Sequence, residues 1–196
     1  MAGMPKIDAP TVAEHHARRR ADIVAAAADL LGADGSTAVT PAAVAARTGL
    51  ARSSVYQYYG STGALVGAAV EEVFRRTIAD IEAEMATAHS PAARVTAYLD
   101  ATLAAAVAGH FPQGTYHAEA LPAETAARLH GLHEALAEPL VTALAEVGVE
   151  DATGVAELVG GIVSSAAIQV QHGEAVEVVR DRLQRFAARA LGLGEL

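Results

Sequence analysis

Apolar side chains recur along most of this chain at intervals of three and four residues, the spacing of one face of an α-helix. Thr11 is suited to begin a first helix, and the glycines at 32 and 35 are suited to end it. This helix would bury a stripe that includes Ile23, Leu30 and Leu31. Alternating β-branched stretches are few. The pattern therefore predicts an all-α protein.

Residues 40–65, TPAAVAARTGLARSSVYQYYGSTGAL, have the pattern of two short helices joined by a tight turn. Thr40 is a suitable N-cap, and Pro41 fits the first helical position, where an amide hydrogen would be unpaired anyway. Gly49 marks the turn, and a third helix is expected from about Ala51 to Tyr58. The segment therefore predicts a helix-turn-helix.

Longer helical patterns follow, separated by Ser-Pro, Gly-rich and acidic breaks. They predict helices at about 62–88, 91–108, 122–147, 152–171 and 174–191. Residues 109–121 are the least regular segment, so we expect a loop or a short helix there.

The charge of the chain is distributed unevenly. Its net charge is −9, which taken alone disfavours nucleic acid as a partner. Residues 1–66 hold six Lys and Arg against five Asp and Glu, which leaves eight basic and 18 acidic residues beyond them. The acidic charge therefore belongs to the C-terminal part, and the N-terminal third is nearly neutral with clustered arginines.

Several classes of protein are disfavoured by the sequence. The chain has no cysteine, which excludes disulfides, thiolate nucleophiles and zinc–cysteine sites. We find no secretory signal pattern and no stretch of 18 residues free of polar groups, so we expect a cytoplasmic protein without a membrane span. Nucleophile-elbow, phosphate-loop and His-Glu-x-x-His motifs are missing, so we expect neither an enzyme nor a cofactor.

The second helix of the helix-turn-helix carries side chains that suit DNA. Arg52, Ser53 and Gln57 could reach base edges in a major groove, where arginine suits guanine and glutamine suits adenine. Hydroxyl groups and arginines nearby could donate to phosphate oxygens and fix the register. The predicted phosphate contacts of this segment are Thr40, Ser54 and Tyr56, and Tyr58 is a further predicted DNA contact. The clustered arginines at 18, 19 and 20 are either DNA contacts or a solvated helix end.

Residues 18–65 resemble the DNA-binding domain of the TetR family of transcriptional regulators. The resemblance is carried by Thr40, Val44-Ala45, Gly49-Leu50-Ala51, Ser54, Val55-Tyr56, Tyr59 and Leu65. It implies an N-terminal three-helix DNA-binding domain and a C-terminal helical domain for ligand binding and dimerisation. The implied boundaries are a disordered tail at 1–10, the helix-turn-helix domain at 11–61 and the second domain at 62–196.

Two positions depart from the family pattern. Thr62 stands where the family has a lysine that typically meets a phosphate, and Ala51 replaces the usual turn serine. Arg18, Arg19 and Arg20 could compensate, and we expect DNA binding with a weaker salt dependence than is usual in the family.

A symmetric dimer is expected from the last two helices. Small residues at helical spacing between 155 and 172 permit close helix contact, and the last helix has an apolar stripe. The predicted interface residues are Gly160, Gly161, Ser164, Ala167, Val179, Leu183 and Phe186. The alternative is that these residues pack within one subunit.

Ligand residues are suggested by polar and aromatic side chains in the C-terminal part. The candidates are Tyr98, Phe111, Tyr116, His117, His133 and Gln169. His130 and His133 could share a helix face, a weak metal signal for which a solvated polar face is the alternative.

The resemblance predicts a dimeric, ligand-responsive repressor that a small molecule releases from double-stranded operator DNA. The alternatives are a TetR-like adaptor that no longer binds DNA and a helical metal-binding protein.

Overall fold

The structure, a computed structural model, describes residues 12–109 and 123–193. These residues form only helices, and the predicted all-α class is confirmed. The elements are α1 (Val12–Asp34), the 3₁₀ helix η1 (Ser36–Ala38), α2 (Pro41–Thr48), α3 (Arg52–Tyr58), α4 (Thr62–Ala86), α5 (Pro91–Val107), α6 (Ala123–Val147), α7 (Ala152–Gln171) and α8 (Val176–Leu191). The predicted tail at 1–10 and nearly all of the irregular segment at 109–121 lie outside the described residues.

Three helices begin in the way that their sequences predict. The hydroxyl oxygens of Thr40, Ser61 and Ser90 each accept a hydrogen bond from the amide three residues later, all at 3.1 Å. Each of these bonds satisfies an amide that would lack a partner in the first turn. Pro41 and Pro91 follow two of the caps and fit there because proline has no amide hydrogen. Local chemistry therefore sets where α2, α4 and α5 begin.

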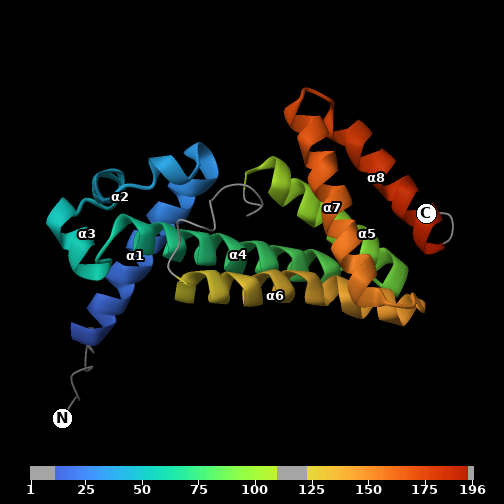
Figure 1. Cartoon of the computed structure of the whole chain (residues 1–196), viewed down its shortest axis with the longest axis horizontal. Coiled ribbons are helices and arrows are strands. Elements are labelled where there is room, and N and C mark those ends of the chain that lie inside the picture. The colour runs from blue at the N-terminus through green and yellow to red at the C-terminus, as the bar shows by residue number, and fades with distance from the viewer. Residues whose placement is uncertain (1–11, 110–122, 194–196) are drawn as a thin grey trace, which may run out of the picture.

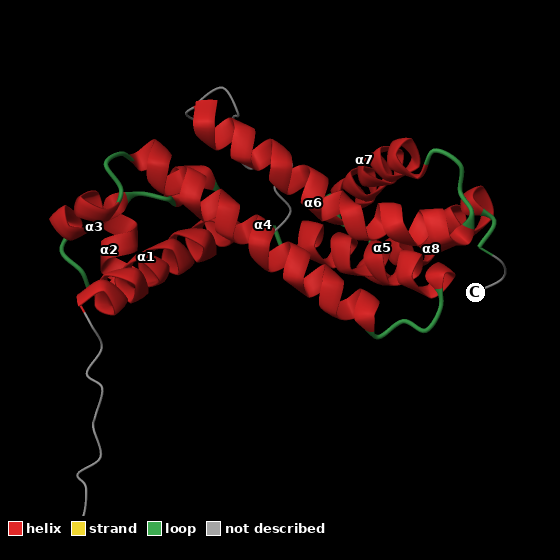
Figure 2. Cartoon of the chain, turned by 90° about the horizontal axis from the view of Figure 1, so that it is seen from below, coloured by secondary structure: helices red, strands yellow, loops and turns green. Residues whose placement is uncertain are grey.

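The 25-residue helix α4 connects the two ends of the molecule. Figure 1 shows α1, α2 and α3 at one end and α7 and α8 toward the other, with α4 passing between them. Figure 2 shows the same helix crossing from the short helices into the C-terminal bundle. Along its length α4 contacts α1, α5 and α6, while α7 packs on α5, α6 and α8. Any change in the tilt of α4 therefore reaches both ends.

One hydrophobic core runs through the described chain. Near the short helices it contains Ile23, Val44 and Val55, and in the bundle it contains Phe74 and Leu140, all fully buried. Burying a side chain of this size contributes about 1.5–3 kcal/mol. The predicted stripe of α1 lies in this core, because Ile23, Leu30 and Leu31 are buried on a helix that packs on α2 and α4.

Candidate nucleic-acid interface

The two short helices are locked together at a glycine turn. Gly49 has a φ of 69°, in the left-handed region that glycine adopts without a side-chain clash. The amide of Leu50 donates to the Ala45 carbonyl at 3.1 Å, and the Thr48 hydroxyl donates to the Val44 carbonyl at 2.8 Å. Val55 is fully buried. These contacts hold α3 at a fixed angle to α2.

The opposite face of α3 is open to solvent. Arg52, Ser53, Tyr56 and Gln57 are all exposed, and they recur at the four-residue spacing of one helical face. Ser54 is half-buried beside them. The seven-residue helix therefore presents two groups suited to base edges, a guanidinium and an amide, beside a phenol.

Arg52 and Tyr56 contact one another on this face. Nη2 of Arg52 donates to the Tyr56 hydroxyl at 3.5 Å, and the guanidinium carbon lies 5.7 Å from the centre of the ring. The hydrogen bond from Arg52 lowers the pKa of the Tyr56 hydroxyl, and the side chain of Thr62 acts in the same direction. The start of α4 thus meets the exposed face of α3 at Thr62, the position where the family pattern has a lysine.

Helix α1 contacts the end of α3. The guanidinium of Arg20 lies 5.0 Å from the centre of the Tyr59 ring, a cation–π contact. Tyr59 is buried, and this burial raises the pKa of its hydroxyl. The Tyr58 ring lies 4.6 Å from the ring of His16. Arg20 and Tyr58, both predicted DNA contacts, therefore also hold α1 against α3.

Arg18 and Arg19 are exposed on α1, and Thr40 is half-buried as the cap of α2. The contact of His16 with Tyr58 is not predicted by the sequence. Tyr58 lies on another helix, so no local spacing could have indicated the contact.

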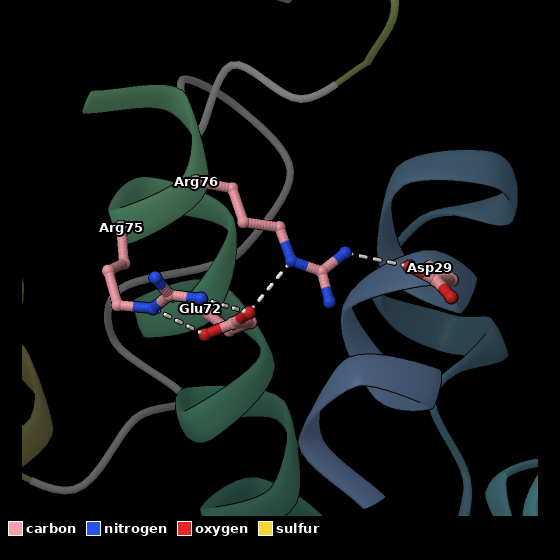
Figure 3. Close-up of polar contacts among 4 residues, drawn as sticks. All are labelled: Asp29, Glu72, Arg75 and Arg76. Atoms are coloured by element: carbon pink, nitrogen blue, oxygen red, sulfur yellow. Dashed lines mark hydrogen bonds and ion pairs between the residues drawn. The ribbon is translucent and has the colours of Figure 1, made fainter. Parts of the chain in front are cut away.

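An ion-pair network that the sequence did not predict joins α1 to α4. Figure 3 shows Arg76 between Asp29 and Glu72, with Arg75 on the far side of Glu72. Arg76 donates to Asp29 at 2.8 Å and to Glu72 at 2.7 Å. Hydrogen bonds from Arg75 and then Arg76 lower the pKa of Glu72, and the bond to Asp29 raises the pKa of Arg76. The network ties the C-terminal half of α1 to the middle of α4.

The predicted ligand residues that the structure describes each have a partner within the chain. Tyr98 is buried, and its hydroxyl donates to the Leu136 carbonyl at 3.3 Å. Burial raises the pKa of the Tyr98 hydroxyl. The His133 ring packs on Phe74 with 4.6 Å between ring centres, and Gln169 accepts a hydrogen bond from an arginine of α8. Phe111, Tyr116 and His117 lie outside the described residues, and the ligand assignment stays a prediction.

The two histidines of the weak metal signal have different surroundings. Nδ1 of His133 lies 2.9 Å from the Leu129 carbonyl, while Nε2 of His130 lies 3.5 Å from a Glu134 oxygen. Within residues 12–109 and 123–193, no three His, Asp or Glu side chains are grouped so that they could hold a metal ion.

The predicted dimer residues divide into buried and exposed sets. Ala167, Val179 and Leu183 are buried within the chain, so they support the outer face of α7 and α8 and do not form it. Gly160 and Ser164 are half-buried and bonded to each other, the Ser164 hydroxyl donating to the Gly160 carbonyl at 2.9 Å.

Gly161 and Phe186 are exposed, and the structure adds three exposed aliphatic residues that the prediction omitted. They are Leu158, Ile168 and Val178. Leu158, Gly161 and Phe186 line one pocket between the two helices, and we call these three residues the α7–α8 face.

Helix α7 is also the one helix of the described chain that is long and apolar enough to cross a membrane by length and composition. Such a composition also suits a helix within a soluble protein, and α7 packs on three other helices.

Comparison with known proteins gives the N-terminal segment a family. Residues 23–69 match the family described as bacterial regulatory proteins, tetR family. The match spans α2, α3 and the adjoining parts of α1 and α4. No curated protein matches the chain in sequence.

Solved structures share the architecture of the chain. A protein from Saccharomonospora viridis, described as a transcriptional regulator in complex with choline, has a TM-score of 0.73 at 16% identity, over 87% of this chain and 96% of that one. The regulator FadR from Bacillus subtilis, in complex with stearoyl-CoA, has a TM-score of 0.67 at 12% identity, over 84% of this chain and 95% of that one. A TetR-like transcriptional regulator from Rhodococcus sp. RHA1 has a TM-score of 0.65 at 20% identity, over 90% of this chain and 97% of that one. Residues 23–69 therefore belong to the tetR family of bacterial regulatory proteins, and the described chain as a whole has the fold of TetR-like regulators.

Proposed function

We propose that this protein is a dimeric transcriptional regulator that binds operator DNA through α3 and leaves it when a small molecule binds the C-terminal part. The observation that carries the proposal is the exposed face of α3. Arg52 and Gln57 stand outward on a helix whose other face is fixed by Val55 and by the turn at Gly49. A rigid helix with outward hydrogen-bonding groups is what reading a major groove requires.

Phosphate contacts would come from around this helix. The exposed arginines at 18 and 19 lie on α1, the helix that contacts the end of α3 through Arg20. The amides at the start of α4 could also donate to phosphates, and Thr62 adds a hydroxyl without a charge. Because few charged groups contribute, log K should depend less steeply on log[salt] than for a protein with many lysine contacts.

Dimerisation would use the α7–α8 face. Leu158 is 69% exposed and Phe186 is 53% exposed, although both lie on helices that otherwise pack into the bundle. A cluster of large exposed apolar residues commonly marks a contact with another protein. A two-fold dimer would place two copies of α3 on one side, which suits a palindromic operator.

The dimer is tested by sedimentation at several protein concentrations. Phe186→Glu and Leu158→Glu should each convert the dimer to a monomer, since each buries a charge in an apolar contact. Val107→Glu is the matched control, because Val107 is an exposed aliphatic residue of α5 outside this face. A wild-type monomer, or dimers in all three variants, would contradict this assignment.

Response to a ligand requires two states with different affinities for DNA. A small molecule releases the operator only if it binds the DNA-incompetent state more tightly. The two similar structures with bound molecules hold choline and stearoyl-CoA, which differ in charge and size. These structures therefore support a small-molecule effector without indicating its chemistry. The kind of effector has to be inferred from the residues of this chain.

DNA binding is tested by selecting bound duplexes from a random pool. The wild-type chain should enrich a palindrome, and Arg52→Ala and Gln57→Ala should each weaken binding to it by about 1–3 kcal/mol. Arg94→Ala is the control, because Arg94 pairs with Glu146 in the C-terminal part, away from α3. Equal binding by all variants would refute the site, and failure to enrich any sequence would favour an adaptor that does not bind DNA.

A further inference from the structure

A cavity of about 680 Å³ lies where α1 and α8 meet α4 and α5. Its volume falls within the range of small-molecule sites, about 300–1,000 Å³. Neither Tyr98, His133 nor Gln169 lines it, so it is separate from the predicted ligand residues that the structure describes. Asp29 and Arg76, two members of the ion-pair network drawn in Figure 3, are among its lining residues.

The wall of this cavity combines a small-residue surface with an excess of carboxylates. Six alanines and Val73 supply the apolar part. Four carboxylates and two guanidiniums supply the charged part, a formal charge of −2 among the described lining residues. Such a wall suits a molecule with an aliphatic body and a positive charge.

Two of the four carboxylates already have partners. Asp29 accepts a hydrogen bond from Arg76 at 2.8 Å, and both oxygens of Asp100 accept from Gln184 at 2.8 Å. Asp100 also lies 3.9 Å from Nε of Arg180. Each of these two carboxylates therefore already has an arginine beside it within the chain.

Asp80 and Glu84 are the acceptors that remain. Both are exposed and line the cavity, and their carboxylates have no hydrogen bond or ion pair in the described structure. They are four residues apart on α4, so their side chains are neighbours on one helical face and repel one another. A cation between them would remove this repulsion and gain charge-assisted hydrogen bonds.

An anion would find both guanidiniums of the wall already paired with carboxylates. Arg76 is held by two carboxylates, so an anionic ligand would have to displace both. Arg180 also lines the cavity with a side chain that is 43% exposed, but its Nε lies 3.9 Å from Asp100, so its charge is already paired. The cavity therefore favours a positive charge over a negative one.

We infer that this cavity binds an aliphatic amine, with its ammonium group between Asp80 and Glu84 and its hydrocarbon chain on the alanine wall. The amine donates hydrogen bonds to the two carboxylates, and the alanines of α5 leave room for methylene groups. Binding itself needs no DNA, whereas a regulatory effect of the amine rests on the function proposed above.

The position of the cavity would connect binding to the DNA-binding helices. Ala28 and Asp29 come from α1, while Asp80 and Glu84 come from α4. A ligand that contacts both helices changes their relative arrangement unless it binds every arrangement equally. By linkage, any change that the amine makes in DNA affinity is matched by the change that DNA makes in amine affinity.

The test is isothermal titration of the full chain, without DNA, with hexylamine, 1-hexanol and hexanoate. These probes share a six-carbon chain and differ in charge at neutral pH. Hexylamine should bind at least about tenfold more tightly than hexanol, the factor expected for one hydrogen bond to a charged group, and hexanoate should bind most weakly. No binding of hexylamine, or equal or tighter binding of hexanol or hexanoate, overturns the inference.

Variants locate the site. The double variant Asp80→Asn, Glu84→Gln should lose about tenfold in hexylamine affinity, and Ala101→Leu, which fills the opposite wall, should lose a similar factor. Glu82→Gln is the matched control, because Glu82 lies on the same helix but faces a groove toward α6. Unchanged affinity in the double variant and in Ala101→Leu, or an equal loss in Glu82→Gln, overturns the site.

A separate measurement of operator affinity with and without hexylamine distinguishes the two proposals. Amine binding that does not change the affinity for DNA supports the proposed amine site and contradicts its regulatory role. Absence of any DNA binding contradicts the proposed function and leaves the titration result unaffected.

Discussion

The turn after α5 touches the end of α1 at a point where a side chain has no room. Gly109 has a φ of 74°, and a Cβ added to it would lie 2.7 Å from the carbonyl oxygen of Gly32. An alanine there adopts the left-handed conformation at a cost of about 1–2 kcal/mol. The clash is with backbone, so the ends of α5 and α1 have to separate, which adds about 1–3 kcal/mol as in other overpacked contacts. Gly109→Ala should therefore lower the free energy of unfolding by about 2–5 kcal/mol.

The measurement is urea unfolding followed by circular dichroism at one fixed protein concentration, because stability of a dimer depends on concentration. Gly148→Ala is the matched control. Gly148 also has a positive φ, 91°, but nothing lies within 4 Å of an added Cβ, so only the conformational cost applies. Gly109→Ala should be less stable than Gly148→Ala by about 1–3 kcal/mol. Equal losses in the two variants would show that α5 does not press on α1 at this point.

Three further changes test the local chemistry. Thr40→Ala should lower the free energy of unfolding in urea by about 1 kcal/mol, since it removes the cap of α2, and a loss near zero would contradict that role. The pKa of Glu72 is lowered in the folded chain, so its ion pairs stabilise above pH 4.5 and stop doing so as the pH falls through the folded pKa. Glu72→Gln should thus cost less than about 1 kcal/mol at neutral pH, because its arginine partners are partly exposed, and nothing in acid; a loss that persists in acid would refute this. Burial raises the pKa of Tyr98 above 10.0, so the wild type should lose stability as the pH rises through the folded pKa, and Tyr98→Phe should lack this loss in a series of urea titrations.

The helices could be predicted because the signals that begin and end them are local. The prediction of 152–171 coincides with α7, and the other long helices differ from their predicted bounds by at most two residues. The serine caps at 61 and 90 accept hydrogen bonds from amides three residues later, and Pro91 occupies the first position of α5. Such short-range signals can be recognised in the sequence. The 3₁₀ helix at 36–38 was missed, because three residues carry no periodic pattern.

The exposed face of α3 was predictable for a similar reason. The buried residue Val55 fixes which side of the short helix faces the core. The positions that face solvent then follow from the 3.6-residue period of an α-helix. The contacts that hold this face in place are different. Tyr58 meets His16 across two helices, and the sequence offers each ring many equivalent partners.

Long-range polar contacts could not be predicted at all. Arg76 pairs with Asp29, 47 residues away, and Gln184 pairs with Asp100, 84 residues away. A charged residue on a helix surface has several opposite charges available elsewhere, and only the packing of the helices selects one. The cavity has the same origin, because its walls come from four helices that no single stretch of sequence relates.

Helix α1 is placed to transmit changes between the two ends of the molecule. In its N-terminal half, Arg20 contacts the ring of Tyr59 just beyond α3. Near its C-terminal end, Asp29 pairs with Arg76 of α4, and Gly32 meets Gly109 after α5. The helix has 23 residues and rises about 1.5 Å for each, so a small tilt at one end becomes a larger displacement at the other. A change at the α1–α4–α5 junction should therefore move the helix-turn-helix as a unit and alter the distance between the two copies of α3 in a dimer, while the internal geometry of α2 and α3, held by Gly49 and Val55, stays as it is.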